Sequence, residues 1–154
     1  MSRALVLACG NTLRGDDGVA PYIAKLLRDD CSDPQIEIRS DQQWPPELAE
    51  PISQAEIVIF VDASSNLPPG KIACRKLKPA PPSQPSFTHQ TSPATLLSLA
   101  NQLYGRGPAQ VFLVTVGGSS FDLVEELSEP VRKAVPEAVK QIKEMLSGFV
   151  WAQD

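Results

Sequence analysis

The N-terminal part of the chain contains the stretch that decides the fold, ALVLACGNTLRGDDG at residues 4–18. Its first six residues, Ala4–Cys9, form a continuous apolar run, which is typical of a strand buried on both faces of a parallel sheet. Residues 10–18 combine three glycines with polar residues and predict a turn-rich loop. A helix is expected directly after this loop, over Val19–Arg28, because its apolar residues recur at helical spacing.

The same alternation of strand and helix continues along the chain. Further strands are expected at Ile36–Arg39, Ile57–Val61, Ile72–Leu77 and Val111–Val116, the third of them polar enough for a sheet edge. Helices are expected after Pro46, over Pro93–Tyr104 with Leu96, Leu97, Ala100 and Leu103 facing the core, and over Leu127–Met145, where Pro136 is expected to break the helix in two. This alternation predicts a three-layer α/β sandwich, with a mainly parallel five-stranded sheet and helices on both faces.

Length and composition narrow the class of protein. A chain of 154 residues is the size of one domain, so a single domain is expected over residues 1–154. The net charge of −4 argues against a nucleic-acid binder, and no apolar run is long enough to span a membrane. Three cysteines without a C-x-x-C pair support neither a disulfide framework nor a zinc site, and the apolar run at the N-terminus is too short for a secretion signal. A cytoplasmic protein is expected.

Two positions carry candidate acidic site residues. Ligands of open α/β sheets gather beyond the carboxyl ends of the strands, so the adjacent acids Asp16 and Asp17 fall in the right loop. Either acid could instead cap the N-terminus of the following helix, and the loop lacks the spacing of a dinucleotide or phosphate loop. Asp62 directly follows five apolar strand residues, where a carboxylate is costly unless it is solvated, hydrogen-bonded or bound to a cation. Its alternative role is to cap a turn with Ser64 and Ser65.

His89 is the only histidine of the chain and completes the candidate set. Two carboxylates and one imidazole at one sheet edge would suit a divalent transition metal, and the hypothesis is that Asp17, Asp62 and His89 converge there. A cysteine nucleophile is disfavoured because Cys9 ends a buried strand and has no adjacent histidine. A serine nucleophile is disfavoured because no G-x-S-x-G elbow is present.

Four motifs in order resemble the hydrogenase maturation endopeptidases over nearly the whole chain. The loop Gly10–Val19 resembles their signature loop, and Val61-Asp62-Ala63 their second motif. His89 followed by Pro93 and Leu96-Leu97 resembles their third motif. The segment Leu127–Ala138 resembles their C-terminal helices. The segment Val116–Ser120 departs from their usual pattern.

The resemblance implies an endopeptidase that removes the C-terminal extension of a nickel–iron hydrogenase large-subunit precursor after nickel insertion. It implies that Asp17, Asp62 and His89 are both the catalytic and the metal-contacting residues. In this family the first acid is often Glu, whereas here both members of the pair are Asp, so the choice between Asp16 and Asp17 stays open. Nickel would be recognised in the substrate, a divalent metal at the site is possible, and a monomer is expected.

The residues leave two alternatives of other classes. One is a non-catalytic, nickel-sensing chaperone that holds the precursor, and the other is an α/β module that binds a small molecule. The chemistry also stays open between a metal that polarises the scissile carbonyl or activates a water, and an aspartate that acts directly as general base.

Overall fold

A computed structural model describes residues 3–78 and 91–151 of the chain. Its strands are β1 (Ala4–Cys9), β2 (Ile36–Asp41), β3 (Ile57–Ser64), β4 (Ile72–Lys76) and β5 (Gln110–Gly117). Its helices are α1 (Val19–Asp30), α2 (Ala49–Gln54), α3 (Pro93–Tyr104) and α4 (Glu129–Met145), with short 3-10 turns at Gly15–Gly18 and Pro46–Leu48. The strands form one sheet in the order β2-β1-β3-β5-β4, in which only β4 runs antiparallel to its neighbour.

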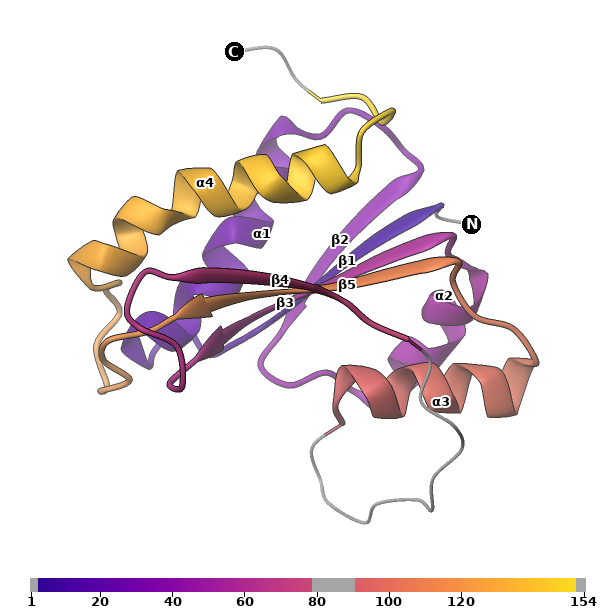
Figure 1. The fold of residues 1–154 in the computed structure, drawn as a ribbon, viewed down its shortest axis with the longest axis horizontal. Coiled ribbons are helices and arrows are strands. Elements are labelled where there is room, and N and C mark those ends of the chain that lie inside the picture. Colours follow the sequence, from indigo (N-terminus) through magenta and orange to yellow (C-terminus); the bar gives the residue numbers. More distant parts are fainter. Residues whose placement is uncertain (1–2, 79–90, 152–154) are drawn as a thin grey trace.

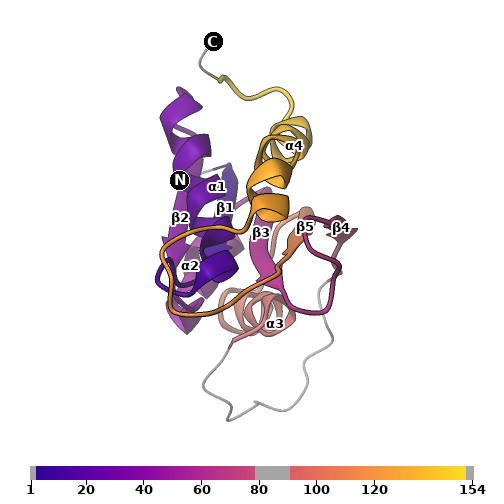
Figure 2. The same ribbon diagram turned by 90° about the vertical axis from the view of Figure 1, so that its left-hand side faces the viewer.

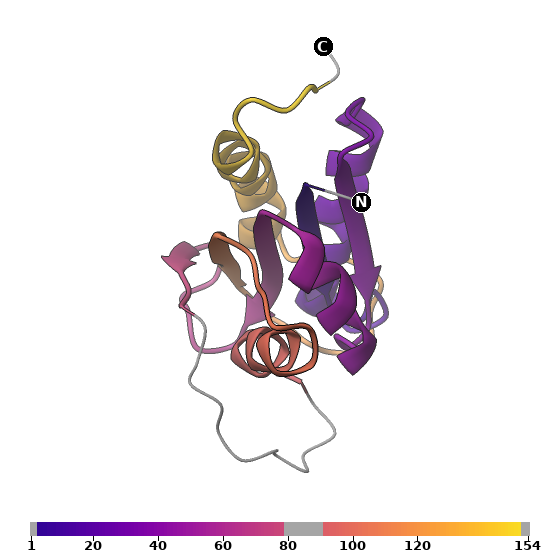
Figure 3. The same ribbon diagram turned by 90° about the vertical axis from the view of Figure 1, so that its right-hand side faces the viewer.

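Helices cover both faces of this sheet, as predicted. Figure 1 shows α1 and α4 above the sheet and α2 and α3 below it, and the two side views agree (Figures 2 and 3). Because side chains alternate along a strand, Ala4, Val6 and Ala8 of β1 pack on the α1/α4 side, whereas Leu5 and Leu7 pack on the α2/α3 side. The inner strands are therefore apolar on both faces, which explains their unbroken hydrophobic runs. The predicted α/β sandwich is confirmed.

Two details of the helices differ from expectation. The predicted break at Pro136 is wrong, because α4 continues through this residue to Met145. Pro136 lies on the exposed side of α4, where water can satisfy the carbonyl that the ring leaves without a donor, while Val135 and Ala138 hold both halves in the core. Leu103 was expected in the core, but 62% of it is exposed in the last turn of α3, whereas Leu96, Leu97 and Ala100 are buried as expected.

The parallel strands β2, β3 and β5 end later than predicted, and this matters for the site. β3 extends through Asp62 to Ser64, paired in register with β5 up to Gly117. The chain leaves β1 toward β2 on one side and returns to β3 on the other, so the strand order reverses between β1 and β3. Such switch points leave a crevice outside the carboxyl ends of the strands. Among the residues described, no helix is long and apolar enough to cross a membrane.

Candidate active site

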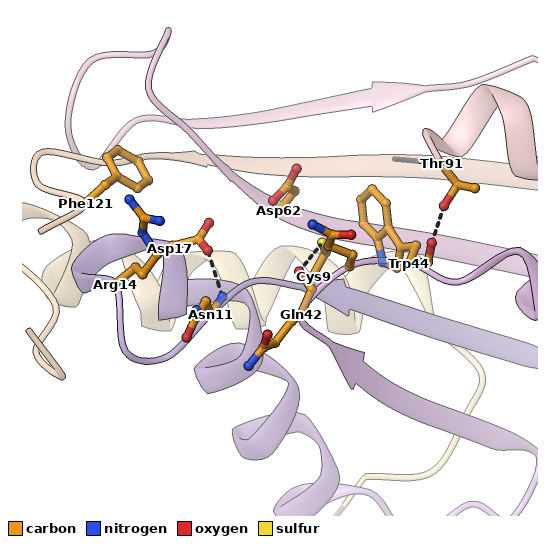
Figure 4. Close-up of a pocket in the computed structure, with 10 residues that line it drawn as sticks. Cys9, Asn11, Arg14, Asp17, Gln42, Trp44, Asp62, Thr91 and Phe121 are labelled. Atoms are coloured by element: carbon orange, nitrogen blue, oxygen red, sulfur yellow. Dashed lines mark hydrogen bonds between the residues drawn. The ribbon is translucent and has the colours of Figure 1, made fainter. Parts of the chain in front are cut away.

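A pocket of about 510 Å³ opens at this switch point, at the carboxyl ends of β1 and β3. Its walls are formed by Cys9, Asn11, Arg14, Asp17, Gln42, Gln43, Trp44, Asp62, Thr91 and Phe121. Figure 4 shows the carboxylates of Asp17 and Asp62 on separate elements, both turned toward the space between them. The structure therefore brings together two of the three predicted site residues.

Asp17 reaches the pocket from the short 3-10 turn that follows β1. Its Oδ2 atom accepts a hydrogen bond of 2.7 Å from the backbone N–H of Asn11, which fixes the carboxylate at the pocket wall. The loop can fold back this tightly because residue 10 is glycine: a Cβ atom there would lie 2.0 Å from the carbonyl oxygen of Asp17. The glycine therefore allows the turn that aims Asp17.

Asp62 reaches the pocket from the last part of β3. Within the strand it follows Val58 and Phe60 on the α2/α3 side, and its Oδ1 atom accepts a hydrogen bond of 2.8 Å from the N–H of Ala63. Burial, with a smaller contribution from the charge of Asp17, raises the pKa of Asp62 to about 6. The alternative role as a turn cap is not observed, because Ser64 is the residue whose side chain accepts the N–H of Asn66 in the following turn.

Asp16 lies next to Asp17 in sequence but points away from the pocket. Its side chain is fully buried and accepts hydrogen bonds from Ser119, Ser120 and Ser128. Burial alone would raise the pKa of Asp16, but these hydrogen bonds outweigh it and hold the pKa below its usual value. The alternative role, capping of the following helix, is not observed for Asp16, since its donors belong to the segment between β5 and α4. Of the two adjacent acids, Asp17 is the one that lines the pocket.

Cys9 also lines the pocket, but its environment keeps it a thiol. Its Sγ atom donates to the carbonyl oxygen of Gln42 at 3.3 Å. Burial, followed by the charge of Asp62, raises the pKa of Cys9 to about 12. The nucleophilic thiolate is therefore disfavoured, in agreement with the expectation of an inert cysteine.

Sequence reasoning missed most of the remaining wall. The indole of Trp44 packs edge-on against Phe60, with ring centroids 5.2 Å apart, and donates its Nε1–H to the carbonyl of Leu7. The hydroxyl of Thr91 in turn donates to the carbonyl of Trp44. One signal was available for Trp44: it follows β2, whose carboxyl end lies beside that of β1, so the same sheet-edge rule applies. No local signal marked Thr91 or Phe121.

The third predicted residue, His89, lies outside the described residues. Over residues 3–78 and 91–151, no group of three or more His, Cys, Asp or Glu side chains is placed to hold a metal. The described part of the site supplies two carboxylates, which is an incomplete set for a transition metal.

Comparisons with known proteins fit this geometry. No protein-family model and no curated protein sequence matches the chain. Among solved structures, it is similar to the hydrogenase maturating endopeptidase HybD from E. coli, with 25% identity and a TM-score of 0.75, covering 97% of this chain and 96% of HybD. It is also similar to a hydrogenase 2 maturation peptidase from Thaumarchaeota archaeon SCGC_AB-539-E09, with 26% identity and a TM-score of 0.70, covering 95% and 99% of the two chains. A NiFe hydrogenase maturation protease, HycI from Thermococcus kodakarensis KOD1, shares the fold at 23% identity and a TM-score of 0.72, covering 96% and 94%.

The fold and the carboxylate-lined pocket thus define a protein of the α/β peptidase class. More narrowly, the comparisons confirm the resemblance to the hydrogenase maturation endopeptidases that the four motifs predicted. The similarity extends over almost the full length of both chains, so it includes the elements that position Asp17 and Asp62.

Proposed function

We propose that this chain is a cytoplasmic, monomeric endopeptidase that removes the C-terminal extension of a nickel–iron hydrogenase large-subunit precursor once nickel is in place. One observation carries the proposal: Asp17 and Asp62 line the same pocket at the switch point of a fold shared with hydrogenase maturation endopeptidases. The catalytic and metal-contacting set of the proposal is Asp17, Asp62 and His89.

The donor set fits recognition of a nickel ion carried by the substrate. Asp17 contributes to the raised pKa of Asp62, which indicates that the two charges repel each other across the pocket. A divalent cation between the carboxylates would remove this repulsion, and imidazole is a favoured ligand of nickel. Thr91 supports the assignment of His89, because it lies in the pocket wall and follows His89 by two residues, a stretch of chain that spans at most about 7 Å.

The residues of the pocket can support peptide hydrolysis directly. Asp62 is ionised at neutral pH but retains a pKa of about 6, close to the range in which a carboxylate is an effective proton acceptor. It can accept the proton of an attacking water and return it to the leaving amine, while Asp17 and His89 hold the substrate in register. Nickel of the precursor, when bound, would supply Lewis-acid polarisation of the nearby carbonyl.

The test is to incubate the protein with precursor prepared with and without nickel and to follow the mass of the large subunit. The wild-type protein should shorten the nickel-loaded precursor and leave the nickel-free one intact. Asp17→Asn, Asp62→Asn and His89→Ala should each leave the precursor uncut. Asp33→Asn is a matched control, because Asp33 also accepts a backbone N–H in a turn but is not part of the pocket.

Two outcomes would contradict the proposal. If wild-type protein binds the nickel-loaded precursor tightly and never shortens it, the nickel-sensing chaperone is the better description. If any of the three site variants cuts at the wild-type rate, the role assigned to that residue is wrong.

A further inference from the structure

The connection between β5 and α4 forms part of the pocket wall without being a helix or a strand. It covers residues 118–128 and contributes Phe121 to the pocket. Because a loop lacks the regular backbone hydrogen bonds of a helix or strand, its position depends on individual contacts with the rest of the protein. We call this connection the Phe121 loop.

One buried carboxylate holds both ends of the Phe121 loop. Asp16 Oδ2 accepts the N–H of Ser119 at 2.7 Å and that of Ser120 at 3.0 Å. At the other end of the loop, Ser128 donates its N–H to Oδ1 and its hydroxyl to Oδ2, both at 2.7 Å. Hydrogen bonds to an ionised acceptor are stronger than neutral ones, and here all four converge on a side chain with no exposed surface.

Backbone contacts and close packing reinforce this attachment. The N–H of Gly15 donates to the carbonyl of Val124 at 2.7 Å, and that of Asp16 to the carbonyl of Ser120 at 2.8 Å. Gly15 has a φ of +56°, and a Cβ atom there would lie 2.6 Å from the carbonyl oxygen of Ser120. The two segments therefore approach each other as closely as a glycine permits.

The attachment has a direct consequence for the pocket, because both segments contribute to its wall. Asp17 follows Asp16 in sequence, and Phe121 follows Ser120. In Figure 4 the Phe121 ring and the Asp17 carboxylate lie at the same end of the pocket, with the Arg14 side chain near both. The hydrogen bonds of Asp16 thus fix the position of an apolar ring relative to an acidic site residue.

We infer that Asp16 is a positioning residue for substrate binding: its buried carboxylate fixes the Phe121 loop, so that Phe121 forms a rigid apolar wall for the bound peptide. The peptide as ligand rests on the proposed function, whereas the attachment of the loop does not. Asp16 touches no substrate and acts on binding through Phe121.

The test combines a measurement of the loop with a measurement of substrate binding. In Asp16→Asn, the amide group of the new side chain can turn a donor toward the loop, so the Ser119, Ser120 and Ser128 amides should exchange with deuterium about 10 to 100 times faster. Circular dichroism should show that the variant stays folded, and amides of β1 and β3 should remain better protected than those of the loop, which separates local release from global unfolding. Asp33→Asn should leave the loop amides unchanged, and Ser128→Ala, which removes only the hydroxyl bond, should have a smaller effect than Asp16→Asn.

Substrate binding is measured as KM and kcat for the nickel-loaded precursor, with Asp16→Asn, Phe121→Ala and the double variant. Each single variant should raise KM about tenfold with a smaller change in kcat, and the double variant should add little, because Asp16 acts through Phe121. An unchanged KM in folded Asp16→Asn, or fully additive effects in the double variant, would overturn the inference. If wild-type protein leaves the precursor uncut, the proposed function fails; the dissociation constant of the uncut precursor then replaces KM, and the same comparison decides the role of Asp16.

Discussion

Two carboxylates at the same end of the sheet, the fully buried Asp16 and the half-buried Asp62, differ in what surrounds them. Asp16 accepts four hydrogen bonds from the Phe121 loop, and its pKa is held below the usual value. Asp62 accepts a hydrogen bond from the N–H of Ala63, and its pKa is raised to about 6 by burial and by Asp17. The same functional group is therefore stabilised as an anion at one position and left poorly solvated at the other.

The difference explains how one residue type has two roles at this edge. A carboxylate that is saturated with donors has little capacity left for a ligand and contributes to stability. A carboxylate with few donors is costly for the fold, but it can still bind a cation or accept a proton. The second kind is expected where a protein trades stability for activity.

The largest effect is expected when the carboxylates that line the pocket are neutralised. Asp17→Asn and Asp62→Asn should each lower the rate of precursor cleavage by about 10²- to 10⁴-fold, because amides neither accept the proton nor bind the cation as carboxylates do. The rate is measured by mass spectrometry, and circular dichroism should show an unchanged fold. Full activity in either variant would show that the replaced residue is not part of the active site and does not differ from Asp16 in the way described.

The next largest effect is a loss of folding stability when Asp16, the carboxylate with four hydrogen-bond donors, is replaced. Asp16→Asn should lower the free energy of unfolding by about 2–4 kcal/mol, because several hydrogen bonds to a buried anion are lost or weakened. Asp17→Asn is the control and should cost less than about 1 kcal/mol, since the amide oxygen can still accept the N–H of Asn11. Urea denaturation at pH 7.5 measures both, and equal losses would show that Asp16 and Asp17 do not differ in the way described.

A smaller effect of opposite sign is expected at Asp62. A pKa raised from about 4 in the unfolded chain to about 6 in the folded protein destabilises the fold progressively between pH 4 and pH 6 and fully above pH 6, and has no effect where both states are protonated, below pH 4. Asp62→Asn should therefore stabilise the metal-free protein by about 1–3 kcal/mol at pH 7.5, and the gain should shrink to nothing near pH 3.5. Denaturation with a chelator present at the two pH values measures it; a gain that does not depend on pH would contradict the raised pKa.

The smallest effect is expected at Cys9, which lines the pocket beside Asp62. Because its pKa is raised to about 12, the thiol is protonated throughout the neutral range. Cys9→Ala should keep the cleavage rate within about twofold and cost about 1 kcal/mol for the lost contact with Gln42. A folded Cys9→Ala protein without activity would point to a cysteine nucleophile instead.

Much of the fold could be predicted from local sequence patterns. Ala4–Cys9 and Pro93–Tyr104 were predicted with the bounds that the structure has, because an unbroken apolar run marks the strand, and helical apolar spacing followed by Gly105 marks the helix. The continuity of α4 through Pro136 was not predictable locally, since it depends on which side of the helix the ring occupies. Packing decides that side.

The candidate site was predictable only in part from the sequence. Asp17 and Asp62 follow apolar strands, and the sheet-edge rule alone places them near each other. The partners of Asp16 lie 103, 104 and 112 residues further along the chain, so no local pattern could distinguish it from Asp17. The prediction for His89 lies outside the described residues and stays a prediction.

The two edge strands of the sheet, β2 and β4, carry charged side chains that prevent strands of other molecules from pairing with them. Strand β4 and its flanks carry Lys71, Arg75, Lys76 and Lys78, all exposed, and β2 carries Glu37, Arg39 and Asp41. A foreign strand that paired with either border would have to strip water from these ionic groups, which is a known protection against aggregation. The protein can therefore keep a crevice open at one end of its sheet without its borders recruiting further chains.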